Sequence, residues 1–183
     1  MRQGAALSKT LLAIALATAW PMALVAHPQL NHASDMPAHG VHARDRAFLQ
    51  QAANEGAAEV LLAQVALKQA SSPSVRQLAQ QLLDDHMQID RELVRLTNLK
   101  QDAQPAMPPP AANQKRTQLQ GLHGPAFDRG YVDDVIDSRQ RALAAFGAAA
   151  RDSLDPDVKQ FAQNRLPMLQ HQLMLAKAIA GSR

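Results

Sequence analysis

The chain lacks cysteine altogether, and only 3% of its 183 residues are aromatic. The absence of cysteine excludes a disulfide framework, a thiolate metal site and a thiol nucleophile. An excess of charge of one sign is lacking too, because acidic and basic residues are interspersed and the formal net charge is +3. With few stacking side chains and no basic stripe, we predict no nucleic-acid partner. The chain is 46% hydrophobic, enough for a single domain with a buried core.

Long hydrophobic runs are also missing, except near the first residue. There Arg2 and Lys9 precede an apolar run from Leu11 to Leu24, and small residues that are typical of a cleavage site follow, up to Ala26. This order predicts a cleaved secretory signal peptide over residues 1–26. The alternative is an uncleaved membrane anchor, but Pro21 interrupts the run, which is shorter than the roughly 20 residues that span a bilayer. We therefore expect a periplasmic protein with no transmembrane segment after cleavage.

A histidine-rich segment follows over residues 27–44. It contains Pro28, Pro37 and Gly40 and has no apolar period, so we predict a disordered leader. Its four histidines are His27, His32, His39 and His42. Two interpretations stay open: a solvated tether, and a weak chelator of copper, nickel or zinc.

An internal repeat organises the rest of the chain. Residues 45–48 recur as residues 128–131, and residues 73–81 recur as residues 156–164, both at an offset of 83. Two segments that share one offset indicate a supersecondary unit present twice. Each copy has the pattern of a helical hairpin, with two amphipathic stretches on either side of a short turn.

We accordingly predict an all-α four-helix bundle over residues 45–180, built from two helical hairpins. The hairpins cover residues 45–100 and 125–180, with helices at about 45–70, 73–99, 125–151 and 156–180. A crossover over residues 101–124, with a short helical turn around Lys115 to Leu122, joins them. This connection is long enough to run the length of one helix, as in bundles with one long crossover.

Three polar side chains fall on the inward faces of these helices. Counting 100° per residue places Glu59, His86 and Arg139 among apolar neighbours on three different helices. Buried charges need partners, so we expect them to meet. One interpretation is a buried polar pair of Glu59 and Arg139 with His86 beside it; the other is a polar or metal site at mid-bundle. His171 falls on the outer side of an ideal helix, unless a kink at Pro167 turns it inward.

An ordered set of motifs resembles one known family. The set comprises Asp45-x-x-Phe48, Asn54-Glu55-Gly56-x-x-Glu59, Asp84-Asp85-His86, Gly124-x-x-Phe127-Asp128-x-x-Tyr131, Leu166-Pro167 and His171. It is similar to the exported bacterial ferritin-like proteins catalogued as domain of unknown function 4142. The resemblance implies a ferritin-like four-helix bundle and an exported protein, and it implies no established activity.

The resemblance also bears on metal binding. Similar members carry a histidine where this chain has Arg139, so a family metal cluster would here consist of Glu59, His86 and His171. Arginine is no metal ligand and competes for Glu59, which argues against a bound metal. A di-iron centre is disfavoured as well, because Leu83 and Met168 stand where Glu-x-x-His motifs need carboxylates.

No residue set compels a reaction, and we predict no catalytic and no cofactor-binding residues. We expect a non-enzymatic exported module that binds an unknown protein or small ligand in the envelope or contributes to stress tolerance. The alternative is a periplasmic metal-binding protein that holds a divalent metal in the bundle cluster or in the histidine-rich leader.

Overall fold

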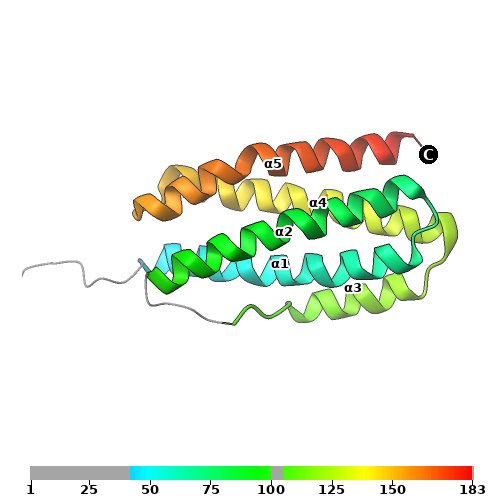
Figure 1. The fold of residues 1–183 in the computed structure, drawn as a ribbon, viewed down its shortest axis with the longest axis horizontal. Helices are drawn as coiled ribbons and strands as arrows, with labels where there is room; N and C mark the ends of the chain where they lie inside the picture. The colour runs from blue at the N-terminus through cyan, green and yellow to red at the C-terminus, as the bar shows by residue number, and fades with distance from the viewer. Residues whose placement is uncertain (1–41, 100–104, 183) are drawn as a thin grey trace, which may run out of the picture. The chain divides into compact units, whose positions relative to one another are not determined.

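The computed structural model describes residues 42–99 and 105–182, and within them every regular element is a helix (Figure 1). The helices are α1 (Ala43–Gln69), α2 (Pro73–Leu99), α3 (Pro110–Gln120), α4 (Gly124–Asp152) and α5 (Pro156–Gly181). The predicted all-α architecture is confirmed. The signal peptide and most of the histidine-rich leader lie outside the described residues, although the last two residues assigned to the leader, Ala43 and Arg44, already belong to α1.

Proline and aspartate mark where several helices begin. Pro73, Pro110 and Pro156 each occupy the first position of a helix, where the missing N–H would have had no partner inside the helix. Asp155 precedes α5, and its carboxylate accepts hydrogen bonds from the backbone N–H groups of Asp157 (2.9 Å) and Val158 (3.3 Å). These local signals account for the agreement between the expected and the observed helix starts.

The four long helices form a ring in which each has two neighbours. α1 packs on α2 and α4, and α5 packs on α4 and α2. The start of α1 lies at the turn between α4 and α5, because Asp45 accepts a hydrogen bond from Asp155 N at 2.9 Å. The start of α4 lies at the turn between α1 and α2, because Asp128 accepts from Ser71 N (3.0 Å) and Ser72 N (2.9 Å). α1 and α4 are therefore antiparallel.

The crossover contains a full helix, which corrects the expected short turn at Lys115 to Leu122. α3 begins five residues earlier, because Pro110 is suited to a first helical position and does not end the run. Ala112 and Leu119 of α3 are buried, and α3 lies alongside α1 (Figure 1). At its end the Gln69 amide donates to the carbonyls of Leu119 and Gln120, both at 3.3 Å.

The apolar interior is divided into two clusters by a polar layer. One cluster surrounds Tyr131 and Leu78, and the other surrounds Phe146 and Phe161. Between them lie charged and polar side chains from all four long helices. This layer is the candidate site.

Candidate functional site

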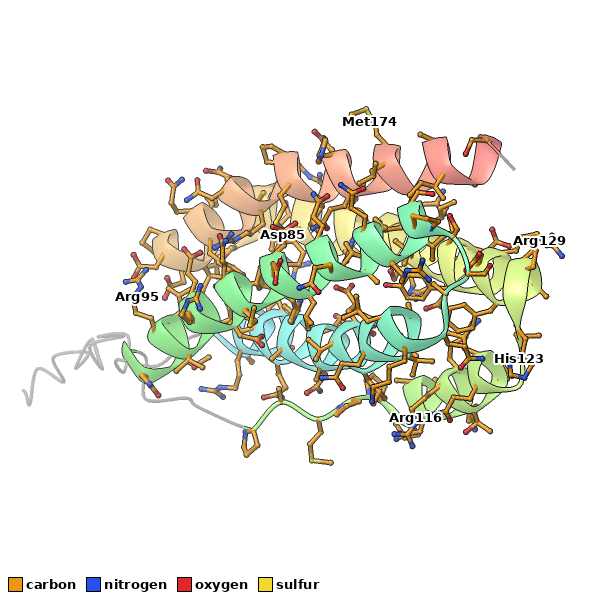
Figure 2. The ribbon with its side chains drawn as sticks, turned by 45° about the vertical axis from the view of Figure 1, so that its right-hand side comes forward. Asp85, Arg95, Arg116, His123, Arg129 and Met174 are labelled. Carbon is orange, nitrogen blue, oxygen red and sulfur yellow. The ribbon has the colours of Figure 1, made fainter. Side chains whose placement is uncertain are left out.

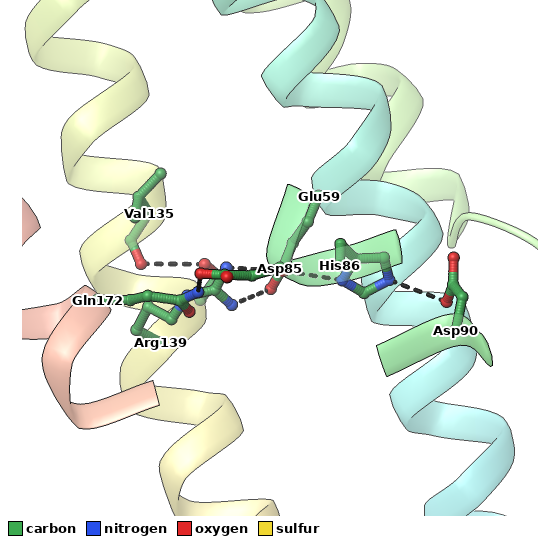
Figure 3. Close-up of polar contacts among 8 residues, drawn as sticks. Glu59, Asp85, His86, Asp90, Val135, Arg139 and Gln172 are labelled. Atoms are coloured by element: carbon green, nitrogen blue, oxygen red, sulfur yellow. Dashed lines mark hydrogen bonds and ion pairs between the residues drawn. The ribbon is translucent and has the colours of Figure 1, made fainter. Parts of the chain in front are cut away.

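Glu59 and Arg139 form a two-pronged ion pair in the polar layer (Figure 3). Arg139 Nη2 donates to Glu59 Oε2 at 2.8 Å, and Nη1 donates to Oε1. The Arg139 side chain is 3% exposed and that of Glu59 is 18% exposed. The structure thus brings together the two side chains that helix geometry placed on facing surfaces, and the carboxylate balances a buried guanidinium.

His86 lies on the other side of Glu59 and is buried. Its Nδ1 is 3.6 Å from Glu59 Oε2, and its Nε2 is 3.2 Å from Asp90 Oδ1 (Figure 3). The Nε2 contact has ion-pair distance but not hydrogen-bond geometry. The ring rests on Gly56, where an added Cβ would come within 1.9 Å of both Cε1 and Nε2. Glycine at position 56 is therefore what lets the imidazole enter the interface between α1 and α2.

A second polar pair in the layer was missed by the sequence analysis. Gln172 Nε2 donates to Asp85 Oδ2 at 2.7 Å, and Gln172 is 1% exposed. The signal was present, since Gln172 lies three residues after Leu169 and four before Ala176, both on the inward face of α5. Asp85 and Gln172 thus tie α2 to α5 as Glu59 and Arg139 tie α1 to α4.

His171 does not join this layer, which corrects its inclusion with Glu59 and His86 as a metal ligand set. α5 continues as a helix through Pro167, so Gln172 points inward and His171 is exposed. Met174, further along the outer face of α5, also points away from the bundle (Figure 2). Across residues 42–99 and 105–182, no three His, Asp or Glu side chains are grouped so as to hold a metal ion.

A cavity of about 70 Å³ opens between α1 and α4 beside the ion pair. The residues of α1 that line it lie on one face of that helix. His86 and Ile89 of α2 and Leu169 of α5 form its floor. The other lining residues are Phe48, Gln51, Ala52, Glu55, Gly56, Glu59, Ser138, Arg139, Arg141, Ala142, Ala145 and Phe146. We call this the α1–α4 cleft. Most of its surface is apolar, and the polar layer closes one end.

A second cavity, of about 380 Å³, lies beneath α3 and shares Glu55, Glu59, Ser138 and Arg141 with the cleft. Asp134 lines it, and Lys115 of α3 is 3.3 Å from this carboxylate. Burial raises the pKa of Asp134 above its usual value, while Lys115 opposes that shift. Glu55 and Glu59 therefore stand where the apolar cleft meets a charged cavity.

Burial also raises the pKa of the Tyr131 hydroxyl, with the charge of Arg139 acting in the opposite direction. Tyr131 stays neutral at physiological pH and contributes as a core side chain, stacked on Phe127 with ring centroids 6.3 Å apart.

Together these features define an all-helical bundle with a self-paired polar layer and an adjoining cleft. The chain belongs to the family described as domain of unknown function (DUF4142), whose model matches residues 30–179. The fold is similar to the crystal structure of a DUF305 fragment from Deinococcus radiodurans, with a TM-score of 0.69 at 18% identity, covering 79% of this chain and 99% of that one. No curated protein gives a significant match.

Proposed function

We propose that this protein is an exported, non-catalytic helical module that binds a small ligand in the α1–α4 cleft. The observation that carries the proposal is the position of the cleft: a mainly apolar cavity ends at buried polar groups that neighbouring helices hold in place. Cavities of this composition, with few fixed polar groups, are the usual binding sites for small molecules in helical bundles.

The arrangement of the polar groups favours binding over catalysis. Both oxygens of Glu59 are engaged by Arg139, and the nitrogens of His86 face two carboxylates. The hydroxyl of Ser138 donates to the carbonyl of Val135 in its own helix at 3.0 Å, so no base activates it. Metal binding at Glu59 has less support, because a metal ion needs several ligands and the described residues offer no group of three His, Asp or Glu side chains there.

Export and a ferritin-like topology are further parts of the proposal. Residues 1–26 have the order of a signal peptide. No helix among residues 42–99 and 105–182 is long and apolar enough to cross a membrane. A single crossover that carries α3 along α1 supports the ferritin-like connection between the hairpins. If the protein is exported, it binds its ligand outside the cytoplasm, and its role is then one of binding or stress tolerance in the cell envelope.

A fragment screen by NMR tests the binding function. The full mature chain is mixed with small molecules of up to about ten heavy atoms and varied charge. Ligands of this size make few contacts, so each contact contributes a large share of the binding free energy. We expect at least one fragment to shift the amide signals of Ala52 and Ala142. Ala142→Leu should abolish the shifts by filling the cleft, whereas Ala144→Leu, on the exposed face of α4, should leave them unchanged. If no fragment shifts cleft signals in the wild type, the proposal is wrong.

A further inference from the structure

We infer that the α1–α4 cleft takes a small aliphatic ammonium group, the aminoalkyl end of its ligand, at Glu55 and Glu59. This inference rests on the proposed function and specifies the chemistry of its ligand. It follows from three observations: the balance of charge, the acceptors that stay open, and the size of the apolar space beside them.

The balance of charge at the site leaves a carboxylate unpaired. Glu55 and Glu59 are four residues apart on one face of α1, so their like charges repel each other. Arg139 neutralises Glu59, but Glu55 makes no hydrogen bond or ion pair with any described residue. Arg141 is exposed, and water screens its charge more than those of the half-buried carboxylates. A bound cation at this point would relieve the repulsion.

Glu55 and Glu59 offer open acceptors in the cleft, whose lining also contains the donor groups of Gln51, Ser138 and Arg141. An ionised carboxylate offers about four lone-pair directions, and Arg139 uses one on each oxygen of Glu59. The Glu59 side chain is 18% exposed, whereas the Arg139 side chain is 3% exposed. An ammonium group has three donors and no acceptor, which matches the open oxygens of Glu59 and Glu55. A ligand carboxylate would meet like charge at the same place.

The apolar part of the cleft sets the size of the ligand. Alanines at 52, 142 and 145 leave space beside the rings of Phe48 and Phe146, which meet edge to face with centroids 5.0 Å apart. A volume of about 70 Å³ is a little more than twice the volume per water molecule in the liquid, about 30 Å³. Since about 10–15 Å³ of such space is enough to hold one water molecule, this room suits a short branched or straight chain of a few heavy atoms.

Three probes with the same branched four-carbon skeleton and different charge test this inference by NMR titration of the full mature chain: isobutylamine, isobutanol and isobutyrate. We expect isobutylamine to shift the amides of Ala52 and Ala142 with a Kd at least about tenfold below that of isobutanol, and isobutyrate not to bind. Glu55→Gln should weaken amine binding about fivefold and leave alcohol binding unchanged. Asp133→Asn, the same change at an exposed site of α4 outside both cavities, should alter neither.

The outcomes separate this inference from the function on which it rests. If isobutanol or isobutyrate binds in the cleft as tightly as isobutylamine, or if Glu55→Gln leaves the amine affinity unchanged, the ammonium assignment is wrong and the cleft still binds ligands. If none of the three binds while another fragment of the screen does, the ammonium assignment is again wrong. If neither these probes nor any fragment binds, both the assignment and the proposed function are wrong.

Discussion

Asp45 and Asp128, 83 residues apart, each accept a hydrogen bond from the turn of the other hairpin: Asp45 of α1 from the α4–α5 turn, and Asp128 of α4 from the α1–α2 turn. The Asp45 carboxylate accepts from the backbone N–H of Asp155, and the Asp128 carboxylate accepts from that of Ser72, both at 2.9 Å. Ser72 and Asp155 are themselves 83 residues apart, so the two hydrogen bonds are equivalent in the repeat. Both aspartates are buried, at 3% and 4% exposure, so the bonds are shielded from water.

These reciprocal hydrogen bonds predict that alanine at the two positions lowers the free energy of unfolding by different amounts. Asp128 also accepts from Ser71 N and from the Ser71 hydroxyl, whereas Asp45 accepts the one bond from Asp155 N. Asp128→Ala should lower the free energy of unfolding by about 3 kcal/mol and Asp45→Ala by about 1 to 2 kcal/mol, measured by urea denaturation. Asp133→Ala, at an exposed position, should cost less than about 0.5 kcal/mol. Equal losses at Asp45 and Asp128 would contradict this account.

Gly56→Ala should be destabilising although alanine favours helices. The new methyl group would collide with the His86 ring, at an expected cost of about 1 to 3 kcal/mol. Gly147→Ala is the control, because its Cβ would meet only Arg151 Nη1 at 3.5 Å, and it should stabilise by up to about 1 kcal/mol. In a double-mutant cycle, His86→Ala should remove the penalty at position 56. Additive losses would mean that the ring does not oppose the methyl group.

Glu59→Ala should lower the free energy of unfolding by about 3 kcal/mol, because it leaves the buried Arg139 without its carboxylate. Replacing Glu59 by Leu and Arg139 by Met together should cost less than the single change. Glu92→Ala breaks the more exposed pair with Arg165 and should cost about 1 kcal/mol or less. Chemical denaturation of these proteins, together with the single variants Glu59→Leu and Arg139→Met, checks this, and a double-variant loss equal to the sum of those two single losses would refute the pairing.

Asp134→Asn should change the pH dependence of stability. Because burial raises the pKa of this carboxyl in the folded state above 3.8, the folded protein holds the proton more firmly than the unfolded chain. The stability that Asp134 contributes is therefore complete at low pH and is lost as the pH rises above 3.8 through the raised pKa. In urea unfolding from pH 3 to 7, the free energy of unfolding of Asp134→Asn should rise relative to that of the wild type as the pH increases. The difference between Asp133→Asn and the wild type should stay constant.

Metal content distinguishes the bundle from the leader. We expect the mature protein without residues 27–42, purified with no tag or chelator, to hold no stoichiometric metal, because Arg139 engages Glu59 and His171 is exposed. Elemental analysis of this variant beside the full mature chain is the measurement. Near one equivalent in both would place a metal in the bundle, and metal in the full chain alone would assign it to the histidine-rich leader.

The four long helices and the central ion pair follow from local sequence rules. Prolines at first positions and the Asp155 cap set the helix starts, and a period of 3.6 residues puts Glu59 and Arg139 on inward faces. Periodicity could place Gln172 on the inward face of α5, but it could not show which turn of a facing helix lies opposite, so Asp85 could not be assigned as its partner. The close approach of His86 to Gly56 depends on the same interhelical register.

α3 shows a different limit of sequence reasoning. Its three prolines at 108–110 indicate a break in the chain, yet the last of them opens the helix. Only two of its residues, Ala112 and Leu119, are buried, so its own apolar pattern is weak. Contacts from α1 and α4, such as the Gln69 amide and the Lys115–Asp134 pair, hold it in place. The sequence pattern of α3 alone cannot show this stabilisation by neighbouring helices.

The two apolar clusters on either side of the polar layer have a consequence for how the bundle opens. Each cluster draws side chains from all four long helices, and thus from both halves of the repeat. Separating the hairpins would therefore expose both clusters at once, whereas fraying one end of all four helices would expose one. The unit that recurs in the sequence is a hairpin, but we expect the unit of local unfolding to be an end of the bundle, so amide exchange should group the residues by end and not by hairpin.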